Sequence, residues 1–173
     1  SNLLASGGSN GKIKVWNIKE QACVHSVNPR RGSICSLFFA GGADSACIAA
    51  ARTGSIIRLW RAEGSSAFAS ETIGELDLGG LSHRAAVFSP SGSFLATNFR
   101  SWAGSGSTAL ELYELESMTK TQSVVIPHFI SYCVAVSPDS KQIVYGGDEG
   151  RIRLFQTDDF GIQRDMDVTE EAR

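Results

Sequence analysis

Long hydrophobic runs and a strong charge of either sign are both missing from this sequence. No run approaches the ~18 apolar residues that a membrane-spanning helix needs, so we expect no such helix. Eighteen Asp and Glu stand against sixteen Lys and Arg, for a net charge of -2. Because the chain as a whole carries no excess of positive charge, its net charge gives no reason to expect nucleic-acid binding. With 42% hydrophobic and 20% charged residues over 173 positions, the composition is that of a folded chain long enough to bury a core.

Cysteine is scarce, and its spacing disfavours the usual metal sites. The four cysteines, Cys23, Cys35, Cys47 and Cys133, include no C-x-x-C pair, whereas zinc sites need closely spaced ligand pairs. The nearest candidate is Cys23 with His25 alone, so we expect no metal and no other cofactor. Each cysteine lies in an apolar run, which predicts small, buried side chains. Free thiols favour a reducing compartment, so we expect an intracellular location, cytoplasmic or nuclear.

A hydrolase-like pattern occurs in GGSNGKIKVW, residues 7–16. Its first five residues form the pattern G-x-S-x-G around Ser9, which is typical of a hydrolase nucleophile elbow. Such an elbow continues into a helix. Residues 12–18 instead alternate charged and apolar side chains, as a strand does. Asn10-Gly11 instead favours a type I′ hairpin turn, in which both residues take positive φ. The three histidines have no companion acid at a diagnostic spacing. We therefore expect no catalytic residues and no enzyme activity.

The feature that the sequence does contain is an internal repeat. The stretches LLASGGSNGKIKVW (3–16), CIAAARTGSIIRLW (47–60) and QIVYGGDEGRIRLF (142–155) align without a gap, and FLATNFRSWAGSGSTALELY (94–113) aligns with six extra residues. An apolar segment and a turn precede the last three copies, and a short β-prone run follows every copy. Each unit therefore predicts four short strands. Such units, recurring every 42 to 53 residues, predict an all-β fold, a β-propeller of four-stranded antiparallel blades.

The repeats resemble a known family. VFSPSG (87–92), VSPDS (136–140) and the endings IKVW, IRLW and IRLF are similar to WD-repeat β-propellers. The chain departs from the usual repeat because Asp follows none of the anchoring aromatics, so we interpret it as a divergent member. The resemblance implies a non-catalytic protein-protein interaction scaffold in an intracellular assembly.

The repeats predict one propeller segment over residues 1–173. We expect a partial blade at 1–28, complete blades at 29–78, 79–127 and 128–168, and a tail at 169–173. The count is about fifteen strands, or just under four blades, and WD-repeat propellers mostly have more. An open arc would expose an apolar blade face at each end. We therefore expect part of a larger propeller, completed by missing blades or by a second copy.

The six extra residues of one copy predict the best functional candidate. They lengthen the hairpin at residues 98–108 and are predicted to place Phe99, Arg100 and Trp102 in a loop whose remaining residues are mainly Gly and Ser. Loops on rigid scaffolds carry binding, and Trp and Arg are enriched at interface hot spots, so these three residues are predicted to bind a partner protein. The alternative is that both aromatic rings pack back over the blade.

A second candidate is basic. Arg30 and Arg31, in NPRRG, resemble the Arg-Arg-Gly signature of phosphoinositide-binding propellers, which makes a phosphoinositide or other anion the alternative ligand, and a membrane a partner under that alternative only. The strand begins sooner after the arginines than in that family, which argues against it. Five basic residues at equivalent strand positions form either a basic rim or an ordinary outward strand face. They are Lys12, Lys14, Arg58, Arg151 and Arg153.

Overall fold

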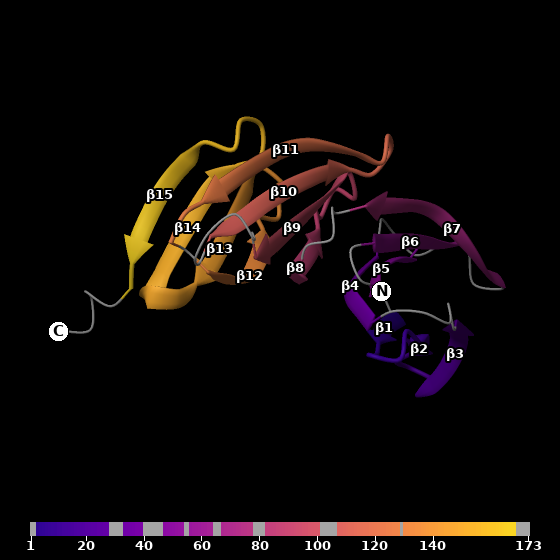
Figure 1. Ribbon diagram of the computed structural model, residues 1–173. Helices are drawn as coiled ribbons and strands as arrows, with labels where there is room; N and C mark the ends of the chain where they lie inside the picture. The colour runs from indigo at the N-terminus through magenta and orange to yellow at the C-terminus, as the bar shows by residue number, and fades with distance from the viewer. Residues whose placement is uncertain are drawn as a thin grey trace. The chain divides into compact units, whose positions relative to one another are not determined.

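The computed structural model describes residues 3–27, 33–39, 47–53, 56–63, 67–77, 82–100, 107–128 and 130–168. Almost all of these residues lie in strands or tight turns (Figure 1). The chain divides into two compact units, unit 1 at residues 1–80 and unit 2 at residues 81–173.

Each unit contains two antiparallel sheets in which every strand pairs with the next along the chain. Unit 1 holds sheet 1, made of β1 (Leu3–Gly7), β2 (Ile13–Asn17) and β3 (Ala22–Val27), and sheet 2, made of β4 (Ser33–Phe39), β5 (Cys47–Thr53), β6 (Ile56–Glu63) and β7 (Ala67–Asp77). Unit 2 holds sheet 3, made of β8 (Ser82–Phe88), β9 (Phe94–Arg100), β10 (Thr108–Glu114) and β11 (Thr119–Ile126), and sheet 4, made of β12 (Ser131–Val136), β13 (Gln142–Gly147), β14 (Arg151–Gln156) and β15 (Ile162–Asp167). Within the described ranges the helical part is one 3-10 turn, Asp148–Gly150. The predicted all-β fold of four-stranded antiparallel sheets is confirmed.

The hairpin between β1 and β2 corrects one local prediction. The two strands are joined by residues 8–12, and the Gly8 N–H donates to the Lys12 carbonyl at 3.1 Å. Gly11 has a φ of 76°, but Asn10 does not take a positive φ, so the predicted type I′ turn is wrong although the hairpin is present. The reason is the longer loop. The Asn10 side chain accepts a hydrogen bond from the Lys12 N–H at 3.1 Å, and only Gly11 needs the left-handed conformation.

The Ser-Pro turns close the hairpins at equivalent places in sheets 3 and 4. The Ser89 hydroxyl accepts hydrogen bonds from the N–H groups of Ser93 and Phe94, both at 3.1 Å. The Ser137 hydroxyl accepts one from the Gln142 N–H at 2.9 Å. A serine at the first position of each turn thus satisfies backbone donors that the turn leaves without a strand partner.

The core of unit 2 lies between sheets 3 and 4. Alternate residues of each strand point to one face, so each sheet can bury one apolar row against the other. The rings of Tyr145 and Phe155 meet edge to face with centroids 5.6 Å apart, and Phe160 packs 5.8 Å from Phe155. The buried cluster comprises Ala96, Leu110, Leu112 and Ile126 from sheet 3, and Ile143, Tyr145, Phe155 and Phe160 from sheet 4 or the turn before its last strand.

Candidate interaction surfaces

A buried polar joint connects sheets 3 and 4. The Asn98 side-chain amide donates to the Ser131 hydroxyl at 2.6 Å, and its oxygen accepts from the Ala85 N–H at 2.7 Å. The Ser131 N–H donates to the Thr108 hydroxyl at 3.0 Å. Asn98, Thr108 and Ser131 are all buried. Ala85 and Ser131 both adjoin register shifts in the first strand of their sheet, so the joint satisfies backbone groups that a bulge removes from regular pairing.

The joint between sheets 1 and 2 has different chemistry. Gly7 occupies the position in its repeat that Asn98 occupies in sheet 3, and Ile34 lies beside the same kind of register shift as Ser131. A Cβ atom on Gly7 would lie 2.3 Å from the Ile34 side chain, so only glycine leaves room for it. The Ile34 N–H donates to the Gly8 carbonyl at 3.1 Å. Unit 1 therefore uses an apolar joint where unit 2 uses a polar one.

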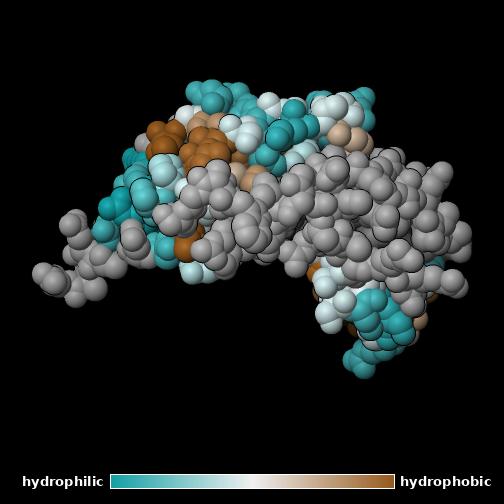
Figure 2. Space-filling model, in the orientation of Figure 1, coloured by the Kyte–Doolittle hydropathy of each residue, from teal (hydrophilic) through white to brown (hydrophobic). Residues whose placement is uncertain are grey.

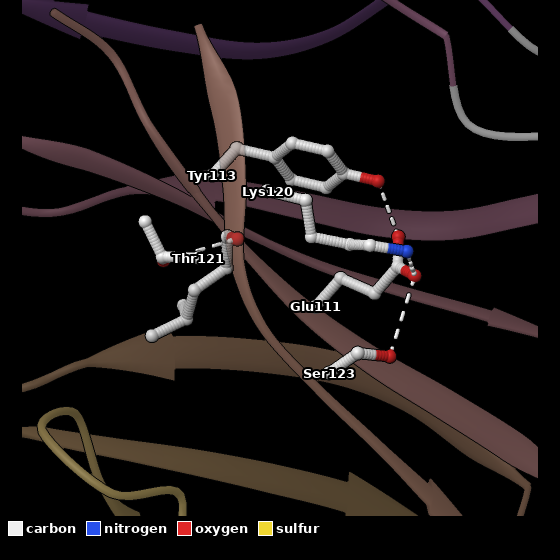
Figure 3. Close-up of polar contacts among 6 residues, drawn as sticks. Glu111, Tyr113, Lys120, Thr121 and Ser123 are labelled. Carbon is white, nitrogen blue, oxygen red and sulfur yellow. Dashed lines mark hydrogen bonds and ion pairs between the residues drawn. The ribbon is translucent and has the colours of Figure 1, made fainter. Parts of the chain in front are cut away.

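A buried carboxylate connects the last two strands of sheet 3, β10 and β11. Figure 3 shows that the Glu111 carboxylate accepts hydrogen bonds from the hydroxyl of Tyr113, the ammonium of Lys120 at 2.9 Å and the hydroxyl of Ser123 at 3.4 Å. Glu111 is buried, while the Lys120 side chain is half-exposed. The sequence interpretation missed this cluster. Its one signal was a glutamate in the middle of the apolar stretch TALELY.

The predicted loop site falls only partly within the described residues. Phe99 lies in β9 and is 5% exposed, so its ring packs inside the protein. Arg100 is the last residue of β9, and Trp102 lies outside the described residues. Arg30 and Arg31 also lie outside them. Partner binding by Arg100 and Trp102, and anion binding by the two arginines, stay predictions.

Three of the five basic residues at equivalent strand positions have partners in their own sheet: Lys14, Arg151 and Arg153. Lys14 lies over the Trp16 ring, 5.2 Å from its centroid. Arg153 and Arg151 reach one carboxylate, Asp165, at 3.0 and 3.5 Å. Lys12 is exposed, and the side chain of Arg58 is outside the described set. Part of the positive charge is thus matched within its own sheet, as expected for an outward strand face.

The cysteine prediction is corrected where the structure describes the side chain. Cys23 and Cys133 are both exposed and reduced. Cys23 lies in β3, the outer strand of sheet 1, and Cys133 lies in the first strand of sheet 4 on the face turned away from sheet 3. An apolar strand pattern predicts burial only when another layer covers that face. Cys35 and Cys47 have side chains outside the described set.

Among the described residues, no three or more His, Cys, Asp or Glu side chains are grouped in a way that could hold a metal ion. In the same part of the chain, no helix is long and apolar enough to cross a membrane.

Comparison with known proteins relates this geometry to a family. Residues 1–17 and 120–156 match WD40, described as WD domain, G-beta repeat. Comparison with curated protein sequences gives no match. Among solved structures, the β-propeller domain of Cps50 (Swd1) from Myceliophteria thermophila is similar, with a TM-score of 0.74 at 14% identity. The match covers 96% of this chain and 52% of that one, so the chain spans about half the length of that domain.

These matches define the class of protein. Consecutive antiparallel sheets with this structural neighbour form a β-propeller. The WD40 matches at residues 1–17 and 120–156 confirm the resemblance to WD-repeat β-propellers that the repeats predict, and the solved structure confirms the propeller fold. Such propellers are generally protein-interaction scaffolds and generally not enzymes. Because 1077 chains of solved structures match this one, the fold alone does not define a partner.

Proposed function

We propose that this chain is a non-catalytic scaffold that binds other proteins within an intracellular assembly. The observation that carries the proposal is apolar surface on sheet 4. Ile152 and Leu154 are only partly buried, whereas Leu110 and Leu112, at the same positions of sheet 3, are buried. Exposed apolar rows on a rigid sheet are typical of protein-binding surfaces. The family's general role as a scaffold supports the same conclusion.

The proposal has two parts that experiments can separate. The first is that further blades, or a second copy, complete the propeller by covering its terminal sheets. The second is that the β9–β10 loop, through Arg100 and Trp102, contacts a partner of the finished scaffold. The half-length match to a solved propeller domain supports the first part.

Affinity capture from cell extract tests the second part. The baits are the wild-type chain, the double variant Arg100→Ala with Trp102→Ala, and the control Lys19→Ala with Glu20→Ala, which changes two exposed residues after β2. We expect a defined set of proteins with the wild type and the control, and loss of at least one protein with the loop variant at an unchanged melting temperature. Identical proteins on all three baits would overturn the role of the loop. No captured protein on any bait would contradict the scaffold function.

A further inference from the structure

The loop that joins β1 to β2 holds an Asn-Gly pair whose chemistry the scaffold function does not use. Asn10-Gly11 occurs once in the chain, and every other asparagine is followed by Leu, Ile, Pro or Phe. An asparagine loses its side-chain amide when the backbone nitrogen of the next residue attacks the side-chain carbonyl carbon. Glycine shields that nitrogen least because it has no side chain. This loop is therefore the place in the sequence where the reaction meets the least steric hindrance.

The side chain of Asn10 is folded back over its own loop. Its Oδ1 atom accepts a hydrogen bond from the Lys12 N–H at 3.1 Å. The same oxygen lies over Gly8, where an added Cβ atom would come within 2.9 Å of it. Because Oδ1 reaches past Gly11 to the next backbone nitrogen, the carbonyl carbon Cγ lies beside the Gly11 nitrogen that attacks it. The fold thus holds the two reacting atoms near each other, which lowers the entropic cost of the reaction.

The hydrogen bonds of the loop act on both reacting groups. Attack at Cγ moves negative charge onto Oδ1, and the Lys12 N–H already donates to that oxygen and stabilises the charge. The Gly11 N–H donates to the Gly8 carbonyl at 3.0 Å, so this bond opens before the nitrogen loses its proton. Asn10 is exposed, and such an opening at the tip of an exposed loop is local. Figure 2 shows a mainly hydrophilic surface where the described residues of sheet 1 are in view, so water reaches this part of unit 1.

We propose that Asn10 is a site of spontaneous deamidation in the folded protein. The Gly11 nitrogen forms a bond to Cγ, the bond from Cγ to Nδ2 breaks, and the amide leaves as ammonia with the proton that the Gly11 nitrogen gives up. The product is a succinimide ring. Water then opens this ring at one of its two carbonyl carbons. Opening at the main-chain carbonyl gives isoaspartate, whose backbone runs through Cβ, and opening at Cγ gives aspartate.

The isoaspartate product changes the loop that connects sheet 1 to sheet 2. The Gly8 carbonyl accepts the N–H groups of Gly11 and Ile34, at 3.0 and 3.1 Å. The Ser33 hydroxyl donates to the Ser9 carbonyl at 3.4 Å. Isoaspartate adds one atom to the backbone of the loop that carries both carbonyls, whereas aspartate keeps its length. We therefore expect the isoaspartate form to weaken the joint of unit 1, and the aspartate form to weaken it less.

Asn17, at the end of β2, is a matched control within the same sheet. Its Oδ1 atom accepts a hydrogen bond from the Lys19 N–H at 3.0 Å, two residues further along the chain, as the Oδ1 atom of Asn10 does from Lys12. The next residue is Ile18, whose β-branched side chain crowds the attacking nitrogen. Ile18 is 56% exposed, so Ile18→Gly removes the crowding without opening a cavity in the core.

The test follows both sites in the folded chain at neutral pH. Samples are digested at acid pH, where the reaction is slow, and mass spectrometry measures deamidation of each peptide. An isoaspartate-specific carboxyl methyltransferase detects the isoaspartate. We expect Asn10 to deamidate at least ~10-fold faster than Asn17, which needs a difference of only about 1.4 kcal/mol between the two barriers. In the Ile18→Gly variant, the rate at Asn17 should rise toward the rate at Asn10.

Three outcomes would contradict the proposal or its consequence. If Asn10 stays intact in the folded chain and deamidates only in urea, the loop protects the site and the proposal is overturned. Equal rates at Asn10 and Asn17 in the wild type would also overturn it. The isoaspartate form, separated by chromatography, should melt at a lower temperature than the variant Asn10→Asp. Equal melting temperatures would overturn the effect on the joint, and none of these measurements depends on a partner protein.

Discussion

Tyr145→Phe should stabilise unit 2, although it removes a polar group from the middle of the fold. Tyr145 is fully buried, and no described residue lies within hydrogen-bond distance of its hydroxyl. The ring packs edge to face on Phe155, and phenylalanine preserves that contact. The substitution therefore removes a desolvated donor and leaves the packing in place.

The expected gain follows from the cost of burying an unsatisfied hydroxyl. That cost is about 1–3 kcal/mol from mutational data. Some of it is offset by the small void that the missing oxygen leaves, so we expect Tyr145→Phe to raise the free energy of unfolding by about 1–2 kcal/mol. For a chain of this size the melting temperature would rise by roughly 2–8 °C. Urea denaturation at pH 7 of the variant and the wild type measures the difference.

Alkaline pH gives an independent reading of the same group. Burial raises the pKa of Tyr145 far above its ordinary value of about 10. Above about pH 10 the unfolded chain releases this proton while the folded chain keeps it, so stability falls as pH rises, by up to about 1.4 kcal/mol per pH unit. Below pH 10 the contribution is constant. The wild type should lose stability faster than Tyr145→Phe between pH 10 and 11. A less stable Tyr145→Phe at pH 7 would refute the reasoning, because it would show that the hydroxyl has a partner, and equal slopes would show that the hydroxyl is not desolvated.

Further substitutions test the joints and the buried carboxylate by urea denaturation. Asn98→Ala should lower the free energy of unfolding by about 2–4 kcal/mol, because it leaves the Ala85 N–H without an acceptor and opens a cavity. Ser131→Ala should lower it by less. Equal stability of Asn98→Ala and the wild type would contradict the polar joint. Gly7→Ala should cost about 1–3 kcal/mol by overpacking, and the loss should shrink in an Ile34→Ala background, whereas strict additivity would argue against the contact. Glu111→Ala should cost about 1–3 kcal/mol, and a change under about 0.5 kcal/mol would show that the cluster contributes nothing.

The sequence predicted strands well because the repeat constrains them several times over. The segments that end in Trp16, Tyr113 and Phe155 share one alternating pattern, and all three form the expected strands. Period-two alternation and the flanking turn residues are local signals, so they survive in each copy separately.

Contacts between strands could not be predicted in the same way. Asn98 and Ser131 are 33 residues apart, and Glu111 meets Lys120 across a register shift that moves the pairing by one residue. A bulge changes which side chains lie opposite each other, and no pattern in the sequence predicted where these bulges occur. The prediction that Cys133 is buried was wrong for a related reason, because burial depends on whether another sheet covers the strand. The prediction of a type I′ turn at Asn10 was wrong because loop length, and not the Asn-Gly pair alone, selects the turn type.

The two joints make the order of the blades part of the chemistry. The joint in unit 1 pairs the small Gly7 with the large Ile34, and the joint in unit 2 pairs two hydrogen-bonding side chains, Asn98 and Ser131. Exchanging the blades would press an isoleucine against an amide, or leave a serine facing empty space beside a glycine. The side chains at each joint are therefore complementary to their own neighbouring sheet and not to the other one. A circular permutant that keeps both pairs together should fold, whereas a shuffled order of the same four sheets should not.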